Sequence, residues 1–376
     1  MKIIQVYQTN PFIEGQGGGV RYVRNLLSGI KKDCSEILFL GIGKNEKNED
    51  NILLKPITKE MTGYIKFLFM MMLKLPFINL SKYDVVHVHR LYFAIPFILL
   101  KPKLKIVCSL HGRTFSVFES NNGSLKLKII KPLFLLIEKF SIRHIDYLVP
   151  VSQDVINSFK SKYSNFENHK IEIIGSMLNL NNFKIMDSKT LQLKFGYENK
   201  YVLFIGRLAD VKDIDFLINL WSKKFDRSPD IKLVIAGDGE LKEELHGLVN
   251  NICVNNQPIL LGEIEPSNIS SLISSSSMTI LSSKHEASPT VVKESLSCGI
   301  PVITNNIGDV KEFIINDKNG YIVEKNFENY FEAILGILKK NITKNNVLLY
   351  SKDNLKKCSI EYVSNRYMEI FKKVIQ

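Results

Sequence analysis

Short apolar runs alternate with longer stretches of helical periodicity along most of the chain. In the first half, runs rich in β-branched residues predict strands at Lys2–Val6, Ile37–Leu40, Val85–Val88, Lys105–Ser109, Tyr147–Val151 and Ile171–Ile174. Helical periodicity predicts helices between several of these strands, at Arg21–Ile30, Met61–Leu75 and Leu125–Arg143.

The second half repeats the same alternation. It predicts strands at Tyr201–Ile205, Lys232–Ala236, Ile259–Leu261, Met278–Leu281, Pro301–Thr304 and Tyr321–Val323, and helices near Lys212–Lys224, Glu240–Asn250 and Thr290–Ser297. Continuous β-branched runs separated by helices are typical of buried parallel strands in βαβ units. Two successive sets predict an α/β protein with two Rossmann-like, doubly wound domains. The polar stretch Leu178–Ser188 is the best candidate for the linker between them.

Composition supports a folded protein and adds a charge asymmetry. The chain has 376 residues, of which 45% are hydrophobic and 23% charged, which argues against a disordered, collagenous or coiled-coil protein. The net charge is +12, and residues 1–180 hold 25 Lys+Arg against 14 Asp+Glu. The first domain therefore has an anionic partner, such as a membrane surface or a phosphorylated substrate, unless the excess only reflects a lysine-rich composition.

The cysteines and the apolar runs indicate the compartment. The five cysteines are widely spaced, with no Cys-x-x-Cys, which argues against a disulfide framework or a zinc site and fits a reducing compartment. The first apolar run, Lys2–Val6, is too short for the core of a signal peptide. No run reaches the ~18 apolar residues of a membrane-spanning helix. We expect a cytoplasmic protein.

Familiar nucleotide motifs fail on spacing. Gly15–Gly19 follows the first strand and opens a helix, but the third glycine of a dinucleotide fingerprint would fall on Val20 or Tyr22. The chain has no P-loop. The glycines could still expose backbone N–H groups to an anion, or simply form a tight turn. Asp213 and Asp215 have the spacing of a metal–diphosphate motif, but acidic residues in a first helical turn are the simpler interpretation.

The segment Ser282–Thr304 carries the clearest chemistry. It reads strand, loop, helix, glycine stop and strand, with Pro289 expected at the first helical position and Gly299 after the last. Glu286 precedes the helix and Glu294 lies within it. A helix rises ~1.5 Å per residue, which spreads these carboxylates too widely for a glycosidase pair. A diphosphate at the helix N-terminus, with one glutamate toward each side of it, would suit a sugar nucleotide.

This segment resembles the Glu-x7-Glu signature of retaining GT-B glycosyltransferases of family four, the glycosyl transferases group 1 type. The resemblance covers nearly the whole chain and consists of several short motifs in the family's order. They are Gly17–Gly19, Asp84–His89, Ser109–Gly112, Asp146–Ser152, Val202–Leu208 with Lys212, Val234–Glu240, Leu260–Gly262 and Gly308–Glu312.

The resemblance implies a GT-B fold, in which two Rossmann-like domains face each other across a cleft. It implies an acceptor-binding domain over residues 1–180, a nucleotide-sugar domain over 181–355, and a C-terminal helix over 356–376 that packs back on the first domain. It further implies a metal-independent, retaining hexosyl- or N-acetylhexosaminyltransferase that uses a nucleotide-diphosphate sugar, by our expectation a UDP-sugar. The leaving diphosphate would help to deprotonate the incoming hydroxyl, and no cofactor is implied.

Roles transfer from the family onto matching positions. Glu286 would bind the donor sugar, Glu294 the ribose, and His111 would contact the sugar at the reacting centre. The remaining implied residues contact the diphosphate, through side-chain charge or backbone N–H groups: Gly18, Arg207, Lys212, Val291 and Val292. We expect His87 and His89 to be structural.

Three positions depart from the family pattern. Lys212 is followed by Asp213 rather than glycine, which places an acid beside the diphosphate lysine. Gly175–Leu178 replaces the motif usual before the linker, and Arg113 after His111 is a candidate contact to acceptor or phosphate.

Residues 63–80 and 125–144 are apolar and basic, and could lie on an anionic membrane or be core helices with solvated lysines. We therefore expect a lipid-diphosphate-linked or surface-polysaccharide acceptor, as in capsule, O-antigen or exopolysaccharide synthesis, and contact with the inner face of the plasma membrane. The competing hypotheses are a GT-B sugar-nucleotide epimerase, a catalytically silent glycan-binding subunit, and a nucleic-acid binder, for which no recognition motif is present.

Overall fold

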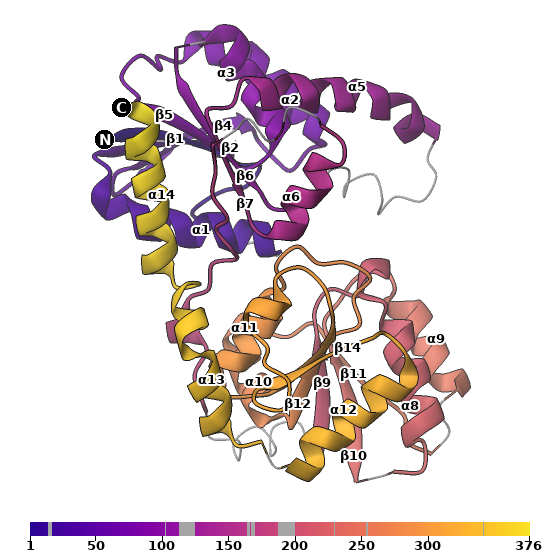
Figure 1. The fold of residues 1–376 in the computed structure, drawn as a ribbon. Coiled ribbons are helices and arrows are strands. Elements are labelled where there is room, and N and C mark those ends of the chain that lie inside the picture. The colour runs from indigo at the N-terminus through magenta and orange to yellow at the C-terminus, as the bar shows by residue number, and fades with distance from the viewer. Residues whose placement is uncertain are drawn as a thin grey trace. The chain divides into compact units, whose positions relative to one another are not determined.

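The computed structural model describes residues 1–13, 17–101, 103–112, 125–163, 166, 170–186, 200–228, 230–252, 255–340 and 342–376. These residues form two compact units. Unit 1 comprises Met1–Met177 and Ile360–Gln376, and unit 2 comprises Leu178–Ser359. Each unit is built on one largely parallel sheet with helices against it (Figure 1).

Unit 1 has eight strands among its described residues, in the order β3-β4-β2-β1-β5-β6-β7-β8. The strands are β1 (Lys2–Val6), β2 (Glu36–Ile42), β3 (Lys47–Glu49), β4 (Ile52–Thr58), β5 (Val85–Val88), β6 (Lys105–Leu110), β7 (Tyr147–Pro150) and β8 (Lys170–Ile171). The helices are α1 (Gly18–Ile30), η1 (Lys31–Asp33), α2 (Tyr64–Lys74), η2 (Leu75–Phe77), η3 (Leu91–Ala94), α3 (Ile95–Leu100), α5 (Leu125–Arg143), α6 (Gln153–Lys160) and α14 (Ile360–Ile375).

Within the described part of this sheet, β3 and β4 pair antiparallel and all other neighbouring strands pair parallel. The chain runs outward from β1 through β2 to β4 and then returns to β5 on the other side of β1. The strand order therefore reverses between β1 and β5. The strand predicted at Ile171–Ile174 is mostly wrong, because β8 ends at Ile171.

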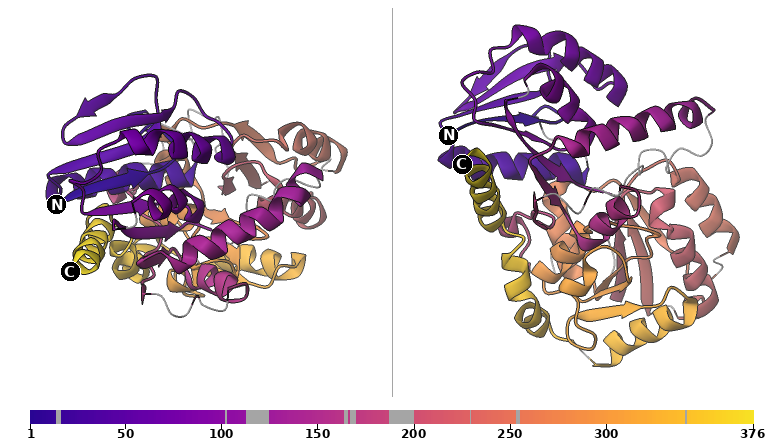
Figure 2. Two further views of the ribbon diagram at one scale, coloured as in Figure 1. Left: turned by 90° about the horizontal axis from the view of Figure 1, so that it is seen from above. Right: turned by 45° about the horizontal axis from the view of Figure 1, so that its top comes forward.

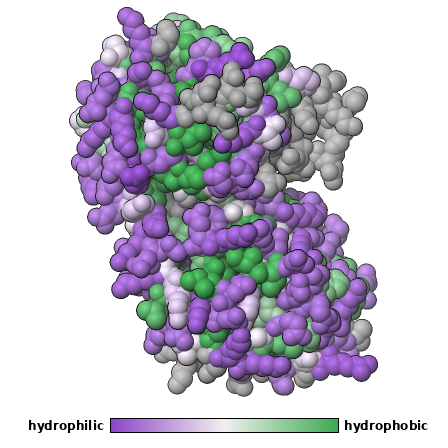
Figure 3. Space-filling view, viewed as in Figure 1, coloured by the Kyte–Doolittle hydropathy of each residue, from purple (hydrophilic) through white to green (hydrophobic). Residues whose placement is uncertain are grey.

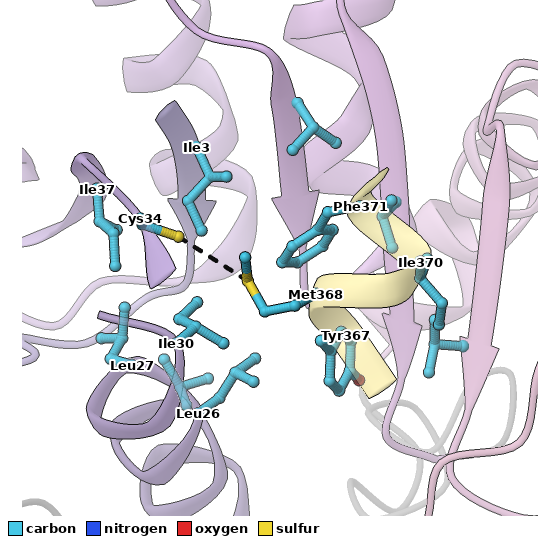
Figure 4. Close-up of a cluster of buried hydrophobic side chains, with 14 of the residues drawn as sticks. Ile3, Leu26, Leu27, Ile30, Cys34, Ile37, Tyr367, Met368, Ile370 and Phe371 are labelled. Carbon is cyan, nitrogen blue, oxygen red and sulfur yellow. Dashed lines mark hydrogen bonds between the residues drawn. The ribbon is translucent and has the colours of Figure 1, made fainter. Parts of the chain in front are cut away.

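The last helix completes the core of unit 1. α14 lies alongside α1 in both views of Figure 2 and contacts it. The two helices approach closely at Gly29, where an added Cβ would lie 1.9 Å from Ser364 Oγ. Figure 4 shows Tyr367, Met368, Ile370 and Phe371 of α14 packed with side chains of β1, β2 and α1, and Cys34 Sγ lies 4.0 Å from Met368 Sδ.

Unit 2 has six strands among its described residues, all parallel, in the order β11-β10-β9-β12-β13-β14. The strands are β9 (Lys200–Ile205), β10 (Ile231–Ala236), β11 (Ile259–Gly262), β12 (Met278–Ile280), β13 (Val302–Asn305) and β14 (Gly320–Val323). The helices are η5 (Leu180–Asn182), η6 (Asp210–Lys212), α8 (Ile214–Phe225), α9 (Lys242–Ile252), α10 (Pro266–Ser275), α11 (Thr290–Ser297), η7 (Val310–Glu312), α12 (Phe327–Lys340) and α13 (Lys344–Lys356).

This order confirms the doubly wound α/β fold expected from the sequence and reverses between β9 and β12. α8, α9 and α12 share one apolar core with the sheet, and α11 and α13 share another. In the part of the chain that the structure describes, no helix combines the length and apolar character needed to cross a membrane.

Candidate active site

In unit 2, the loops that follow β9 and β12 carry the charged residues singled out by the sequence. Ligands of open α/β sheets bind at the carboxyl ends of the strands where the strand order reverses. β9 leads into η6, which ends at Lys212, and β12 leads into the loop that holds Glu286. Two residues 74 positions apart thus meet at the reversal point.

Lys212 and Glu286 form an ion pair between Nζ and Oε1. Ser283 Oγ donates a hydrogen bond of 3.1 Å to the same carboxylate oxygen. The side chains of Lys212 and Glu286 are 22% and 17% exposed, so the ion pair is shielded from most solvent but still accessible to a ligand. A bound anion can share Lys212, while Glu286 can accept hydrogen bonds from sugar hydroxyls.

Backbone contacts hold the two loops in register. Ser282 Oγ donates to the carbonyl oxygens of Lys212 and Asp213, at 3.0 and 2.8 Å. The amide of Lys284 donates to the carbonyl of Val211 at 2.8 Å. A Cβ on Gly308, whose φ is +52°, would lie 2.8 Å from the carbonyl oxygen of Glu286, so the β13 loop presses on the same segment. The positions of the acid and the base are therefore fixed relative to each other.

Asp213 has its own counter-ion. Its φ is +49°, it precedes α8, and its carboxylate pairs with Lys325. Lys325 therefore neutralises Asp213, so that Asp213 does not compete with a ligand for Lys212. The helix start predicted from Asp213 and Asp215 is confirmed, since α8 begins at Ile214. Among the described residues, no group of three or more His, Cys, Asp or Glu side chains is arranged to hold a metal ion.

The N-terminus of α11 has no side-chain cap. Pro289 is the residue before the helix, not its first position as the sequence predicted, and Gly299 follows the helix with φ +72°. The backbone N–H groups of Val291 and Val292 belong to the first turn, which normally needs external acceptors. The dipole of such a turn favours an anion.

A buried network of charged and polar side chains anchors the start of α11. Lys293 is fully buried and pairs with Asp309 at 2.8 Å. Lys293 Nζ also donates to Ser288 Oγ at 2.7 Å, and Ser288 donates to Asp309 at 2.6 Å. The network joins both ends of the first helical turn to the loop after β13, which fixes the direction of the helix.

The remaining candidate residues of unit 2 differ in exposure. Glu294 is buried in α11, with 4% of its surface exposed. Arg207 is mostly exposed and pairs with Glu240 at 3.0 Å. Arg207 is thus free to turn toward a ligand at small cost, because exposed ion pairs contribute only ~0–1 kcal/mol.

In unit 1, the glycine turn opens α1 at the end of the β1 loop. Gly17 has φ +101°, and an added Cβ on Gly19 would lie 2.3 Å from Tyr7 Oη. An added Cβ on Gly18 would meet nothing within 4 Å. Gly17 needs glycine for its backbone conformation, and Gly19 needs it for close packing against Tyr7. Gly18, in contrast, faces open space that a ligand could occupy. Gly15 and Arg113 lie outside the described residues.

The histidine at the end of β6 belongs to a hydrogen-bonded chain. His111 Nε2 lies 2.9 Å from His89 Nδ1, and His89 Nε2 lies 3.1 Å from Gln5 Oε1. Because the Gln5 oxygen only accepts, His89 Nε2 carries the proton and His89 Nδ1 accepts one from His111 Nε2–H. His111 Nδ1 is left as an acceptor.

All three histidines at this edge are held neutral. Burial, followed by the charge of Arg90, lowers the pKa of His111 to about 3. Burial is also the main cause that lowers the pKa of His87 and His89 well below the usual value. A neutral His111 can exchange hydrogen bonds with a sugar without carrying a charge.

A second chain of hydrogen bonds links this edge to the last helix. His87 Nε2 lies 2.7 Å from Ser109 Oγ, which lies 2.6 Å from Tyr367 Oη. Tyr367 Oη lies 2.8 Å from Tyr22 Oη, and the Tyr22 ring packs edge-on against His111 with centroids 4.7 Å apart. α14 therefore helps to position His111.

The sequence missed part of this arrangement. It treats His89 as structural, although the structure joins His89 directly to His111. The available signal was the spacing of His87 and His89 at the end of a strand, which puts both on one face. Gln5 and Tyr22 gave no signal, because each looks like an ordinary strand or helix residue until the strands are paired.

Comparison with known proteins bears on both units. Residues 16–181 match the family model described as Glycosyltransferase Family 4, and residues 187–353 match the one described as Glycosyl transferases group 1. Together the two matches leave only five residues between them. An uncharacterized glycosyltransferase of Methanocaldococcus jannaschii is 25% identical over 331 residues, 82% of each chain.

A further relative is N-acetylgalactosamine-N,N'-diacetylbacillosaminyl-diphospho-undecaprenol 4-alpha-N-acetylgalactosaminyltransferase of Campylobacter jejuni. It is 26% identical over 242 residues, 61% of this chain and 64% of the relative. Among solved structures, sucrose-phosphate synthase from Thermosynechococcus elongatus has a TM-score of 0.82 at 16% identity over 99% of this chain and 98% of its own. HepE of Anabaena in complex with UDP has a TM-score of 0.76 at 17% identity, over 99% and 100%.

These matches define the class of protein. The fold is GT-B, with two α/β units of largely parallel sheets. The chain belongs to the glycosyl transferases group 1 proteins of glycosyltransferase family 4 and is a glycosyltransferase.

Proposed function

We propose that the protein moves a sugar from a nucleotide-diphosphate donor, a UDP-sugar, to an acceptor hydroxyl with retention of configuration. The observation that carries this proposal is the Lys212–Glu286 pair beside the uncapped start of α11, at the strand-order reversal of unit 2. This pair brings a cation and a carboxylate together at the sheet edge where α11 begins, and in this proposal the cation binds the diphosphate and the carboxylate binds the sugar. HepE, which has a similar fold, binds UDP.

In this proposal the charges of Arg207 and Lys212, with the N–H groups of Val291 and Val292, hold the diphosphate. Glu294 accepts hydrogen bonds from the ribose. The bond from the anomeric carbon to the diphosphate breaks as the acceptor oxygen bonds to the same face of the sugar. The acceptor proton passes to the departing phosphate. Protein cations and helix N–H groups stabilise the charge that develops there, without a metal or cofactor in the proposed step.

Glu286 binds the donor sugar, and His111 contacts it at the reacting centre. The neutral state of His111 suits this role, because a neutral ring can exchange hydrogen bonds with hydroxyls next to a positively charged sugar. A cationic ring would oppose the charge that develops on the anomeric carbon.

Thermal unfolding with UDP, GDP and ADP, each without added metal, tests the donor half of the proposal. A ligand at 100 times its Kd adds about 2.7 kcal/mol to the free energy of unfolding. We expect UDP to raise the midpoint and Glu294→Gln to lose that rise. Glu332→Ala, at an exposed position of α12, is the matched control and should keep it. Folded protein that responds to none of the three nucleotides would contradict the proposal.

We further propose a lipid-diphosphate-linked or surface-polysaccharide acceptor, as in capsule, lipopolysaccharide or exopolysaccharide synthesis. The name of the Campylobacter jejuni relative describes a diphospho-undecaprenol acceptor. In unit 1, an apolar ridge supports contact with an anionic membrane, where such acceptors reside. We define this ridge as Met61, Ile65, Phe69, Leu73 and Phe77, which repeat every four residues and are each at least half exposed.

Charge around the ridge fits the same partner. Between Glu60 and Asp84 the chain has three lysines and no acidic residue. α3 contacts both α2 and α5, and exposed Leu99 and Leu136 on these neighbours extend the apolar surface. Figure 3 shows apolar residues reaching the surface of unit 1. Apolar side chains bordered by lysines are the features that hold a helix in the interface of an anionic bilayer.

A further inference from the structure

Arg90 sits at the carboxyl end of β5, at the strand-order reversal of unit 1. Its guanidinium donates to Tyr64 Oη at 3.3 Å, and its Cζ lies 4.6 Å from the centre of the Tyr64 ring. Burial raises the pKa of Tyr7, and the charge and hydrogen bonding of Arg90 oppose that rise. Arg90 therefore lies among tyrosines from the β1 loop and the start of α2.

No carboxylate balances this charge within the described part of the chain. Ion pairs are present at other arginines, such as Arg207 with Glu240 and Arg366 with Glu172, but none involves Arg90. The groups that act on its charge are the hydroxyls of Tyr7, Tyr64 and Tyr92, and its charge in turn acts on His89 and His111. A partly buried cation without a counter-ion is costly, so proteins seldom retain one without a use.

Tyr92 supplies an independent observation. Tyr92 is 95% buried, yet its hydroxyl makes no hydrogen bond of normal geometry among the described residues, although the Arg90 guanidinium is close enough to act on it. The ring packs 5.8 Å from that of Tyr64, centroid to centroid, and the charge of Arg90 acts on its hydroxyl. A buried hydroxyl without a partner costs ~1–3 kcal/mol unless a ligand satisfies it.

We propose that Arg90, Tyr7, Tyr64 and Tyr92 form a binding site for an oxyanion carried by the acceptor. The proposal rests on the proposed function, since it assigns the acceptor its chemical class. The planar guanidinium offers paired donors that match a carboxylate or a phosphate, and the hydroxyls supply further donors. The charge of Arg90 also acts on His111, so the site lies on the same sheet edge as the proposed reacting centre.

A phosphate of a diphosphate-linked lipid and the carboxylate of a small acid share this chemistry, and two probes distinguish them. Inorganic diphosphate and L-malate are titrated calorimetrically into the full-length chain carrying Lys212→Gln, which disables the donor-side anion contact. Added to that background, Arg90→Gln should weaken binding at least about tenfold, because hydrogen bonds to charged groups contribute ~1.5–3 kcal/mol. Arg90→Lys should weaken it less, since the charge stays but the paired donors are lost.

Arg143→Gln is the matched control, because Arg143 is an exposed arginine of the same unit. It should bind as its parent does. Binding of diphosphate that depends on Arg90 supports the site and assigns a phosphate-bearing acceptor, whereas binding of malate that depends on Arg90 assigns a carboxylate-bearing one. Equal binding by the Arg90→Gln and Arg143→Gln variants, or binding of neither anion, overturns the proposal.

The stability of the free protein gives a second readout. If Arg90 is an uncompensated charge kept for a ligand, Arg90→Gln should leave the unfolding midpoint unchanged or raise it. A lowered midpoint in a chain that binds neither anion would assign Arg90 to packing and overturn the site. UDP stabilisation of the otherwise native chain is measured separately, so loss of the donor proposal and loss of the oxyanion site give different results.

Discussion

Three histidine rings lie close together at one edge of the unit 1 sheet, and no carboxylate among the described residues acts on any of them. The rings of His87 and His89 have centroids 4.2 Å apart, and those of His89 and His111 are stacked at 5.2 Å. A proton on any one of them would face its neighbours and Arg90. Burial and mutual repulsion thus keep the rings neutral.

This neutrality makes the stability of unit 1 depend on pH. The unfolded chain takes up protons near pH ~6.5, whereas the folded rings do not until the pH is far lower. Stability therefore falls as the pH falls below ~6.5, by up to ~1.4 kcal/mol per pH unit for each ring. His87→Phe should reduce that slope by up to the contribution of one ring, measured by urea unfolding between about pH 5 and pH 7.

His144→Phe, at an exposed position of unit 1, is the control and should keep the slope of the parent. The prediction fails if His87→Phe changes the level of stability but leaves its dependence on pH as it was.

Some residues of the candidate site could be assigned from the sequence, and others could not. Lys212 and Glu286 could be assigned to one end of unit 2 because each follows a strand that is legible as a β-branched run. Their direct pairing could not be foreseen, since it depends on β9 and β12 being neighbours. Arg90 and Tyr92 could not be assigned a role from the sequence. Whether a charge or a hydroxyl has a partner depends on which residues the fold brings next to it.

Among the elements, α2 differs most from an ordinary surface helix. Phe67 and Met71 face the interior, while Ile65, Phe69 and Leu73 form a row on the other side. Steps of four residues on an α-helix turn by only about 40° each, so the row stays continuous along the helix. The helix thus has two apolar faces, of which the fold uses only one.

Phe69→Ser should weaken co-sedimentation with vesicles containing phosphatidylglycerol. Loss of one aromatic side chain that inserts into the bilayer interface should weaken the free energy of membrane binding by ~1.5–3 kcal/mol, or about tenfold or more in partitioning. Leu349→Ser, which replaces a leucine of α13 in unit 2 that is at least as exposed as Phe69, should leave partitioning unchanged. Absence of any binding by the parent chain at low salt would remove the membrane proposal.

Most strands of the unit 1 sheet were predictable, because they are buried on both faces and their sequences are continuous apolar runs. β1 and β5 begin and end at the predicted residues. β4 was missed because Pro56 interrupts its apolar pattern. The proline is tolerated because β3 pairs only with Ile52–Leu54 and leaves that side of Pro56 without a ladder to complete.

At the scale of the molecule, the chain begins and ends in the same unit. Six large buried side chains of α14 complete the apolar core of unit 1: Val363, Tyr367, Met368, Ile370, Phe371 and Val374. Burial of each such residue contributes ~1.5–3 kcal/mol, so their sum is of the order of a whole domain's stability. Unit 2 receives no residue of α14.

A chain that stops after Ser359 should therefore lose the folded state of unit 1 and keep that of unit 2. Thermal unfolding should show a single transition that still responds to UDP, with reduced total heat. A chain that stops after Val374 removes only two exposed residues and should keep both transitions. Two intact transitions in the shorter chain would show that α14 is not required.

The same arrangement sets an order of events during synthesis. Domains usually fold from the N-terminus as the chain emerges from the ribosome, at ~5–20 residues per second. Here the 182 residues of Leu178–Ser359 are made between the two parts of unit 1, a delay of roughly ten to forty seconds. Unit 2 can close while the first-made strands still lack the helix that covers them. The nascent chain therefore carries an open apolar face while about half of its residues are made, and this interval is when a chaperone would matter most to it.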